Sequence, residues 1–357
     1  MVQMIEYKKK LTIKDMAKAL NVSTATISNA FNRPDQLSES LRLRIIEGCQ
    51  RLGYEGPNAA ARSLRTGVSG IVGVLLADSL SYCISDPVAS QFLAGLADVL
   101  DQRQCNMLLL PGQEEQTSYK SRQMESMVDG YIIYGGLHPS KRFQRLLQQS
   151  KPIIAVDVDT TDFITVNIDN QEGAYRSARL ALQHRPQKVA IISLRLTPVS
   201  SVSWATCDAC YASPASVSRS RWLGYMQALQ EYNYPLEQLS VVDVPVNTHR
   251  NACMAAFMLL SQEERPDVII CMSDRMALGA LQVALQQHIA VPNDLKIVGF
   301  DGIAESQFTH PTLTTVQQYN ELKGQMAGNM FLGLTPRQNV ILPTDMLMGE
   351  TCPEVMS

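Results

Sequence analysis

Near the start of this 357-residue chain, small polar residues are spaced so that one helix could present all of them on one face. Ser23 is a natural N-cap, and Ile27, Ala30 and Phe31 recur at the spacing of a buried helical face. The pattern leaves four residues facing outward: Thr24, Ala25, Ser28 and Asn29. Hydroxyl and amide groups on an exposed helix can hydrogen-bond to base edges in the major groove of DNA, so the pattern favours a nucleic-acid reader.

Elements on either side must hold this helix in place. A preceding helix is predicted from the apolar spacing of Ile13, Met16, Ala17 and Leu20, with Thr12 as its cap. A third helix is predicted from Ser38 through Leu41, Ile45 and Leu52, with Gly53 ending it. Three short helices around one apolar core form a head over about 11–56. A helical hairpin with no nucleic-acid partner is the alternative.

Charge is unevenly distributed between the head and the rest of the chain. Residues 1–67 contain eleven Lys and Arg against six acids, a balance of +5, whereas the whole chain has a formal net charge of −3. A basic head on an acidic body suits a polyanion partner for the head alone. No apolar run is long enough to span a membrane, and the first ten residues lack the apolar middle of a secretory signal. We therefore expect a cytoplasmic protein that makes no membrane contact and whose eight cysteines are reduced.

After residue 70 the sequence pattern alternates between buried strands and helices. Continuous apolar runs predict strands at 71–76, 107–110, 130–134, 152–156, 189–193, 268–272 and 296–300. Helical patterns lie between them, at 88–102, 115–127, 141–149, 171–183, 219–232, 250–261 and 275–288. This alternation is typical of doubly wound α/β folds, and about 290 residues suit two such sheets rather than one. Ligands of such folds bind beyond the carboxyl ends of the strands.

The usual signatures of catalysis are missing from the sequence. It contains no nucleophile elbow, phosphate loop or paired His-Glu metal motif, so we expect neither an enzyme nor a bound cofactor or metal. Cys207 and Cys210 form one Cys-x-x-Cys pair, which is too few ligands for a zinc site. They lie in a long insertion, 194–218, that we expect to be a mobile loop over the ligand; a thiol or metal input through this pair is an alternative. A second insertion, 79–85, lengthens the first strand-to-helix loop.

Several segments, taken together, resemble the LacI/GalR family of bacterial transcription regulators. Besides the helix pair, the landmarks are Ala59 to Gly67 (AAARSLRTG), Val128 to Gly130 (VDG), Val166 to Asn170 (VNIDN), Ser273 to Leu281 (SDRMALGAL), Val298 to Asp301 (VGFD) and Pro311 to Val316 (PTLTTV). The resemblance covers nearly the whole chain. It implies a helix-turn-helix head at 1–56, a hinge helix at 57–67 and a body like periplasmic binding proteins. The first subdomain of that body would be 68–166 plus 302–318 and the second 167–301 plus 319–357, with crossings near 166–170, 301–302 and 318–319.

The resemblance also implies a function and the residues that carry it. The DNA contacts would come from Thr12, Ser23, Thr24, Ala25, Thr26, Ser28, Asn29, Asn32, Asn58, Ala61 and Leu64, with Leu64 wedged into the minor groove. The effector cleft would be lined by Asp78, Asp86, Val88, Ala89, Asp157, Arg221, Asn247, Ser273, Asp301 and Gln318. A homodimer on a pseudo-palindromic double-stranded operator is expected, acting as a repressor controlled by a sugar or related metabolite. A sugar-binding module or enzyme that does not bind DNA is the alternative from another class.

Overall fold

The computed structural model describes residues 11–56, 67–112, 119–136, 141–212, 214 and 216–355, with side chains omitted for 119–121. Clustering of contacts divides the chain into two compact units, 1–70 and 71–357, and each is described separately below. Three residues of the expected hinge helix, Asn58, Ala61 and Leu64, lie outside the described residues.

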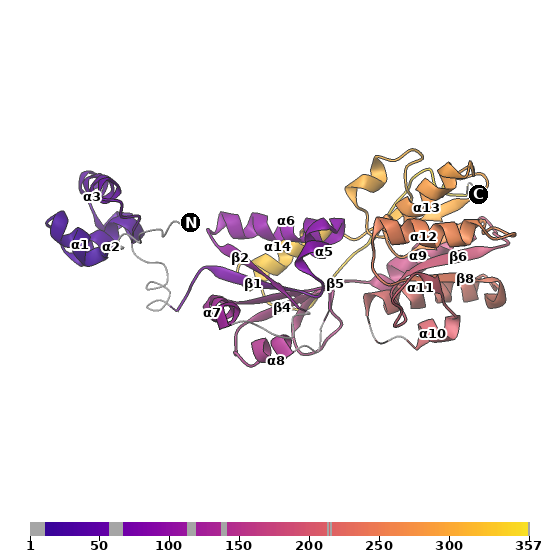
Figure 1. The fold of residues 1–357 in the computed structure, drawn as a ribbon, viewed down its shortest axis with the longest axis horizontal. Helices are drawn as coiled ribbons and strands as arrows, with labels where there is room; N and C mark the ends of the chain where they lie inside the picture. The colour runs from indigo at the N-terminus through magenta and orange to yellow at the C-terminus, as the bar shows by residue number, and fades with distance from the viewer. Residues whose placement is uncertain are drawn as a thin grey trace, which may run out of the picture. The chain divides into compact units, whose positions relative to one another are not determined.

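The first unit contains the three predicted helices, α1 (Ile13–Ala19), α2 (Thr24–Asn32) and α3 (Glu39–Arg51), and a short 3-10 turn, η1 (Pro34–Gln36) (Figure 1). Thr12 and Asp15 form a capping box at the start of α1, which satisfies backbone N–H groups that have no partner within the helix. The three helices enclose a core of Met16, Ala17, Ile27, Ala30, Ile45, Cys49 and Tyr54. Leu52, which we expected to be buried, is 45 % exposed because it is the C-cap residue of α3.

The second unit contains a six-stranded parallel sheet in the order β12-β5-β4-β3-β1-β2. Its strands are β1 (Ile71–Leu76), β2 (Asn106–Pro111), β3 (Gly130–Tyr134), β4 (Ile153–Val156), β5 (Ile164–Ile168) and β12 (Val340–Leu342). The helices of this subdomain are α5 (Leu80–Ser85), α6 (Pro87–Gln102), α7 (Tyr119–Met127), α8 (Lys141–Leu147) and α14 (Asn320–Phe331). The expected loop insertion at 79–85 is thus largely the helix α5.

A five-stranded sheet in the order β10-β9-β6-β8-β7 forms the second subdomain. Its strands are β6 (Val189–Leu194), β7 (Ser203–Trp204), β8 (Ser240–Val244), β9 (Val268–Cys271) and β10 (Lys296–Val298). Around it lie α9 (Asn170–Leu182), α10 (Cys207–Tyr211), α11 (Val217–Glu231), α12 (His249–Leu260) and α13 (Asp274–Gln286), with short 3-10 turns η2 (Leu236–Gln238) and η3 (Ala304–Gln307). Among the described residues, no helix is both long and apolar enough to cross a membrane.

The expected division of the carboxyl-terminal third between the subdomains differs from the one observed. Helix α14 packs against α6, and β12 pairs in parallel with β5, so 320–342 belongs to the first subdomain. Residues 303–317 stay with the second subdomain, where the N–H of Ile303 donates to Asp274 at 2.9 Å. The small antiparallel pair β11 (Thr315–Gln317) and β13 (Asp345–Leu347) lies beside them. The crossings therefore lie at about 168–170, at 318–319 as expected, and at 343–344 rather than 301–302.

The described residues of the insertion at 194–218, which we expected to be a loop, include a strand and a helix. It adds β7 to the sheet, antiparallel to β8, so that the insertion covers the edge of β8. Helix α10 then packs on α11, with the ring centroids of Tyr211 and Trp222 5.8 Å apart. In its described part, the insertion therefore packs on the second subdomain through β8 and α11.

Candidate functional site

The surface of the head that we expect to contact base edges is the amino-terminal half of α2. Thr24 and Ala25 are exposed, while Ser28 and Asn29 are half-buried on the following turn. Ile27 and Ala30 are fully buried on the opposite face, which fixes the direction in which the polar face points. The structure therefore brings the four residues expected to face outward onto one accessible side of a short helix.

Other polar side chains of the head make hydrogen bonds within it. Ser23 Oγ accepts from the N–H of Thr26 at 3.0 Å and lies 2.8 Å from the Thr26 hydroxyl. Asn32 Nδ2 donates to the carbonyl of Ser28 at 3.0 Å, and the Thr12 hydroxyl donates to Asp15 at 2.7 Å. These residues cap and order the helices, while Thr24, Ala25 and Asn29 have no hydrogen-bonding role of that kind among the described contacts.

In the body, the centre of the polar cluster is Asp301, just beyond the end of β10. Its Oδ1 accepts from Arg221 Nη1 at 3.2 Å and from Gln318 Nε2 at 2.7 Å. Arg221, on α11, also donates from Nε to Asn170 at 3.0 Å and stacks on the Phe300 ring at 3.6 Å from the ring centroid. Oδ2 of Asp301 accepts from the N–H of Asp274 at 3.3 Å, and Arg221 and Asp301 are both buried.

From Gln318 the cluster continues into the first subdomain through Lys323, which the sequence analysis did not select. Lys323 Nζ donates to Gln318 Oε1 at 2.8 Å and to Asp157 Oδ2 at 2.7 Å. Its side chain is fully buried on α14. One sequence pattern could have revealed it: Lys323 lies on the same face of α14 as the buried residues Gly324, Ala327, Met330 and Phe331. A buried ammonium needs a charged partner, and Asp157, the residue after β4, supplies it.

A second group of contacts joins the two subdomains near the start of α6. Arg275, on α13, donates from Nη2 to the carbonyl of Ser85 at 2.8 Å and lies 3.4 Å from Asp86 Oδ1. Its Nη1 donates to the carbonyl of Asn247 at 2.6 Å. Ser273 belongs to the same group, because its hydroxyl donates to Asn247 Oδ1 at 2.9 Å.

The remaining expected residues lie around Asp86. Its Oδ2 caps α6 by accepting from the N–H of Ala89 at 3.1 Å, and Val88 is half-buried on the same first turn. Asp78 is exposed after β1. Burial raises the pKa of Asp86, and the charge of Asp78 adds to that shift. Eight of the ten predicted cleft residues form two groups. Lys323 links Asp157 to the group of Gln318, Asp301 and Arg221, and Arg275 links the pair Asp86 and Ala89 to the pair Asn247 and Ser273.

Burial shifts the ionisation of this cluster. It raises the pKa of Asp301, and Arg221 opposes that shift by favouring the carboxylate. Burial likewise raises the pKa of Asp274, whose carboxylate accepts from the Thr315 hydroxyl, and lowers the pKa of Lys323 against the pull of Asp157. Ionisable groups shifted in this way by burial and by specific partners are typical of functional sites.

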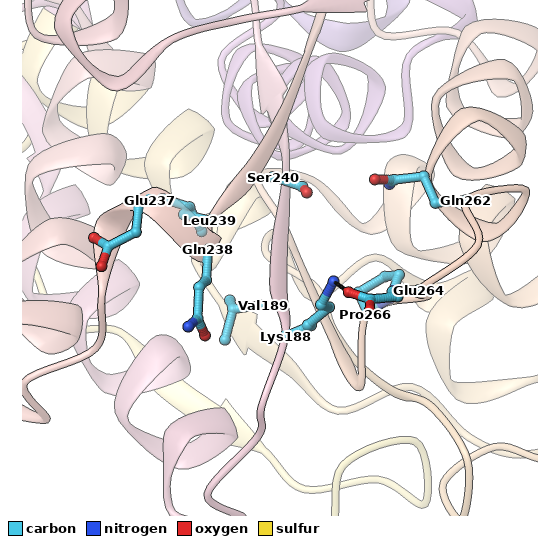
Figure 2. A pocket seen from close by; sticks show the side chains of 9 residues that line it. All are labelled: Lys188, Val189, Glu237, Gln238, Leu239, Ser240, Gln262, Glu264 and Pro266. Atoms are coloured by element: carbon cyan, nitrogen blue, oxygen red, sulfur yellow. Dashed lines mark hydrogen bonds and ion pairs between the residues drawn. The ribbon is translucent and has the colours of Figure 1, made fainter.

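A polar cavity of about 210 Å³ lies elsewhere in the second subdomain (Figure 2). Lys188 and Glu264 form an ion pair in its wall, beside Val189 and Ser240. These last two are the first residues of β6 and β8, so the cavity lies at the amino ends of the strands. Ligands of open α/β sheets bind at the carboxyl ends, which is where the Asp301 cluster lies.

The two cysteines of the insertion do not have the environment of a reactive pair. Burial raises the pKa of Cys210 to about 12, and it also raises the pKa of Cys207. Since the thiolate is the reactive form and the metal ligand, both shifts act against a thiol input. Within the described part of the chain, no three His, Cys, Asp or Glu side chains are grouped so as to hold a metal ion.

Both units of the chain match models of known protein families. Residues 12–58 match the model of the bacterial regulatory proteins of the lacI family, and residues 209–352 match that of the periplasmic binding protein-like domain. An HTH-type transcriptional regulator of Mycobacterium tuberculosis is 30% identical over 352 residues, covering 96% of this chain and 97% of its own. The HTH-type transcriptional regulator IpsA of Corynebacterium glutamicum is 30% identical, with 92% of each chain covered.

Solved structures of similar fold include members of the same family. A LacI-family regulator from Corynebacterium glutamicum superposes with a TM-score of 0.70 at 25% identity, covering 97% of this chain and all of its own. The lac repressor dimer bound to operator has a TM-score of 0.75 at 20% identity, over 97% of this chain and all of its own, which shows a shared fold. The relatives are regulators and not enzymes. This chain therefore belongs to the lacI family of bacterial regulatory proteins and is a DNA-binding transcriptional regulator.

Proposed function

We propose that the protein is a repressor that binds a pseudo-palindromic operator as a homodimer in the cytoplasm and is controlled by a small molecule. The observation that carries the proposal is the buried polar cluster around Asp301, which joins the two subdomains at the carboxyl ends of their strands. A sugar or related metabolite bound there would favour one relative arrangement of the subdomains over another. Differential binding of effector to two arrangements is what changes operator affinity.

The effector would contact the ten residues expected from the sequence, with Lys323 and Arg275 added by the structure. Arg221, Asp301, Gln318 and Asp157 would form one wall of the effector site, and Asp86, Asn247 and Ser273 would form the other. One solved relative is a cellobiose complex and another contains ribose, which supports a sugar-like effector for this chain as well.

The operator contacts would centre on α2. Asn29 can pair with both hydrogen-bonding atoms of an adenine edge, a contact that discriminates by roughly 1–3 kcal/mol. Ala25 can contact a thymine methyl, and Thr24 can hydrogen-bond to a base or phosphate. In the proposed hinge, Asn58 and Ala61 would follow the minor groove while Leu64 would unstack the central base step.

The dimer would form through an exposed apolar surface on α12 and α13. Phe257 is 60 % exposed and Met254 46 %, and together with Met258 and Val283 they line a hollow of about 630 Å³. Large apolar side chains gathered on one surface mark interaction sites. A second copy is the occupant we propose, because the similar fold of the lac repressor binds its operator as a dimer.

The test is to select bound sequences from random DNA and then to measure the affinity of the protein for the selected sequence. We expect a site with two-fold symmetry, and Asn29→Ala should relax preference at one position of each half-site. Gln50→Ala, on the exposed side of α3, is the matched control. If no sequence-specific site emerges, the operator proposal fails; if Leu64→Ala leaves affinity and bending unchanged, only the hinge assignment fails.

A further inference from the structure

We propose that Arg42, on α3, is a positioning residue for DNA recognition that sets the base preference of Asn29. Its guanidinium holds the last turn of α2, the turn from which the Asn29 side chain projects. The inference rests on the proposed function, because Asn29 is given the role of contacting a base there. Arg42 is not among the DNA contacts expected from the sequence.

Helix α2 has few means of stabilising its own ends. It contains nine residues, and isolated helices shorter than about 12–15 residues are marginal in water. It has no acidic residue in its first turn and no basic residue in its last turn, so no charge within the helix favours its dipole. Its two ends therefore depend on groups outside the helix.

The amino-terminal end of α2 is anchored by Ser23. Its Oγ accepts from the N–H of Thr26 at 3.0 Å, which satisfies a donor that has no partner within the helix. Thr24 and Ala25 lie in this first turn. Their positions relative to DNA therefore depend on the cap at Ser23.

The carboxyl-terminal end of α2 is anchored from another helix, by Arg42. The side chain of Arg42 is half-buried, and its Nε donates to the carbonyl of Ala30 at 3.3 Å. The last four carbonyls of a helix lack partners within the helix, and a cation beside them is favoured by the helix dipole. Because Ala30 is 0 % exposed, water cannot supply a donor to its carbonyl in place of Arg42.

Asn29 is the base-contacting residue that this anchor affects most directly. It precedes Ala30 in the last turn, and its carbonyl accepts from the N–H of Arg33 at 2.8 Å. An amide that pairs with both atoms of an adenine edge must satisfy two directional hydrogen bonds at once, so it tolerates little backbone motion. Without Arg42 the Ala30 carbonyl would be buried and unsatisfied, which favours fraying of this turn. The base preference of Asn29 should then weaken, while that of Thr24 should not.

The test measures the preference of the full chain for each base pair of the selected operator half-site. Asn29→Ala and Thr24→Ala first identify the base pairs that these two side chains contact. We expect Arg42→Gln to reduce the preference at the Asn29 base pair by about three- to tenfold, the effect of one lost hydrogen bond, and to leave the Thr24 base pair unchanged. Ser23→Ala should do the reverse.

Arg44→Gln is the matched control, because Arg44 is exposed on the same helix and carries the same charge. Loss of a phosphate contact or of general attraction to DNA weakens binding to all sequences about equally. A uniform loss in Arg42→Gln, or an unchanged preference at the Asn29 base pair, overturns the proposal.

Hydrogen exchange of the free protein measures the fraying itself. In Arg42→Gln the amide of Arg33 should exchange faster, while the amide of Ile27, which donates to the Ser23 carbonyl at 3.1 Å, should exchange as in the wild type. Faster exchange at both would show that the whole head is destabilised. The preferences are then measured on Arg42→Met, which removes the donor but keeps an apolar stem, and the same loss at the Asn29 base pair is expected.

The selection experiment separates this proposal from the proposed function. If a two-fold symmetric site is selected but Asn29→Ala alters no base preference, the operator function stands and the role assigned to Arg42 is wrong. If no sequence-specific site is selected, the proposed operator function itself fails.

Discussion

Arg275 joins the two subdomains on one side of the cleft, and its removal gives the sharpest test of how cleft closure controls the protein. Arg275→Gln deletes the contact between the guanidinium on α13 and Asp86 at the start of α6, and weakens the hydrogen bond to the Ser85 carbonyl. The contact to the Asn247 carbonyl lies within the second subdomain, so its loss does not affect the relative position of the two. The substitution therefore acts on the arrangement of the subdomains.

The size of the effect follows from burial. The side chains of Arg275 and Asp86 are 16 % and 9 % exposed, so the pair is shielded from water rather than on the surface. Hydrogen bonds to charged groups in such places contribute about 1.5–3 kcal/mol. A loss of about 2 kcal/mol changes the equilibrium between the present arrangement and a more open one by about 30-fold. Effector affinity should fall by up to the same factor, since the effector must then also close the cleft.

Small-angle X-ray scattering of the ligand-free protein measures the opening, and calorimetry measures the change in effector affinity. We expect a larger radius of gyration for Arg275→Gln and recovery of the wild-type value at saturating effector. Arg265→Gln, an exposed residue between α12 and β9, is the control. Scattering and affinity equal to those of the wild type would show that Arg275 does not hold the subdomains together.

Three further predictions concern stability. Gly95→Ala should destabilise the body by about 1–3 kcal/mol in thermal unfolding, because the added methyl would overlap the backbone carbonyl of Glu321 where α6 meets α14; an unchanged melting temperature would contradict this packing. Ile27→Ala, at a fully buried position, should cost the head about 2–5 kcal/mol, measured as faster hydrogen exchange of its helices and loss of DNA binding, with exchange in the body as the internal control. Because the pKa of Asp301 is raised in the folded state, its contribution to stability is fully present below the ordinary aspartate pKa of about 4 and is lost as pH rises through the raised value. The melting temperature of the wild type relative to Asp301→Asn should therefore fall with rising pH, and a difference independent of pH would refute it.

Local patterns predicted most of the fold. The seven apolar runs correspond to β1, β2, β3, β4, β6, β9 and β10 within two residues at each end, because strands buried on both faces leave continuous apolar sequence. Ser23 and Thr12 cap their helices as expected, since capping depends only on residues three positions apart. The short strands β12 and β13 were missed because three residues carry too little pattern.

The candidate site was predicted less completely. Arg221, Asp301 and Gln318 come together as expected, but Lys323 was missed because a lysine on a helix is normally exposed, and only the packing of α14 on α6 buries it. Arg275 was recognised only as part of a family motif. Its contact between the two subdomains was not predicted, because its partners Ser85 and Asp86 lie about 190 positions earlier in the chain.

The sequence by itself determined the helices of the head, the alternation of strands and helices, and the family. Each of these depends on spacing within a few residues or on motifs in order along the chain. Tertiary structure alone decided which subdomain receives α14 and β12, and that Asp157 and Lys323 form a buried pair 166 positions apart in the chain. The physical reason is that chain crossings and buried ion pairs depend on which surfaces pack together, and that choice leaves no periodic trace in the residues involved.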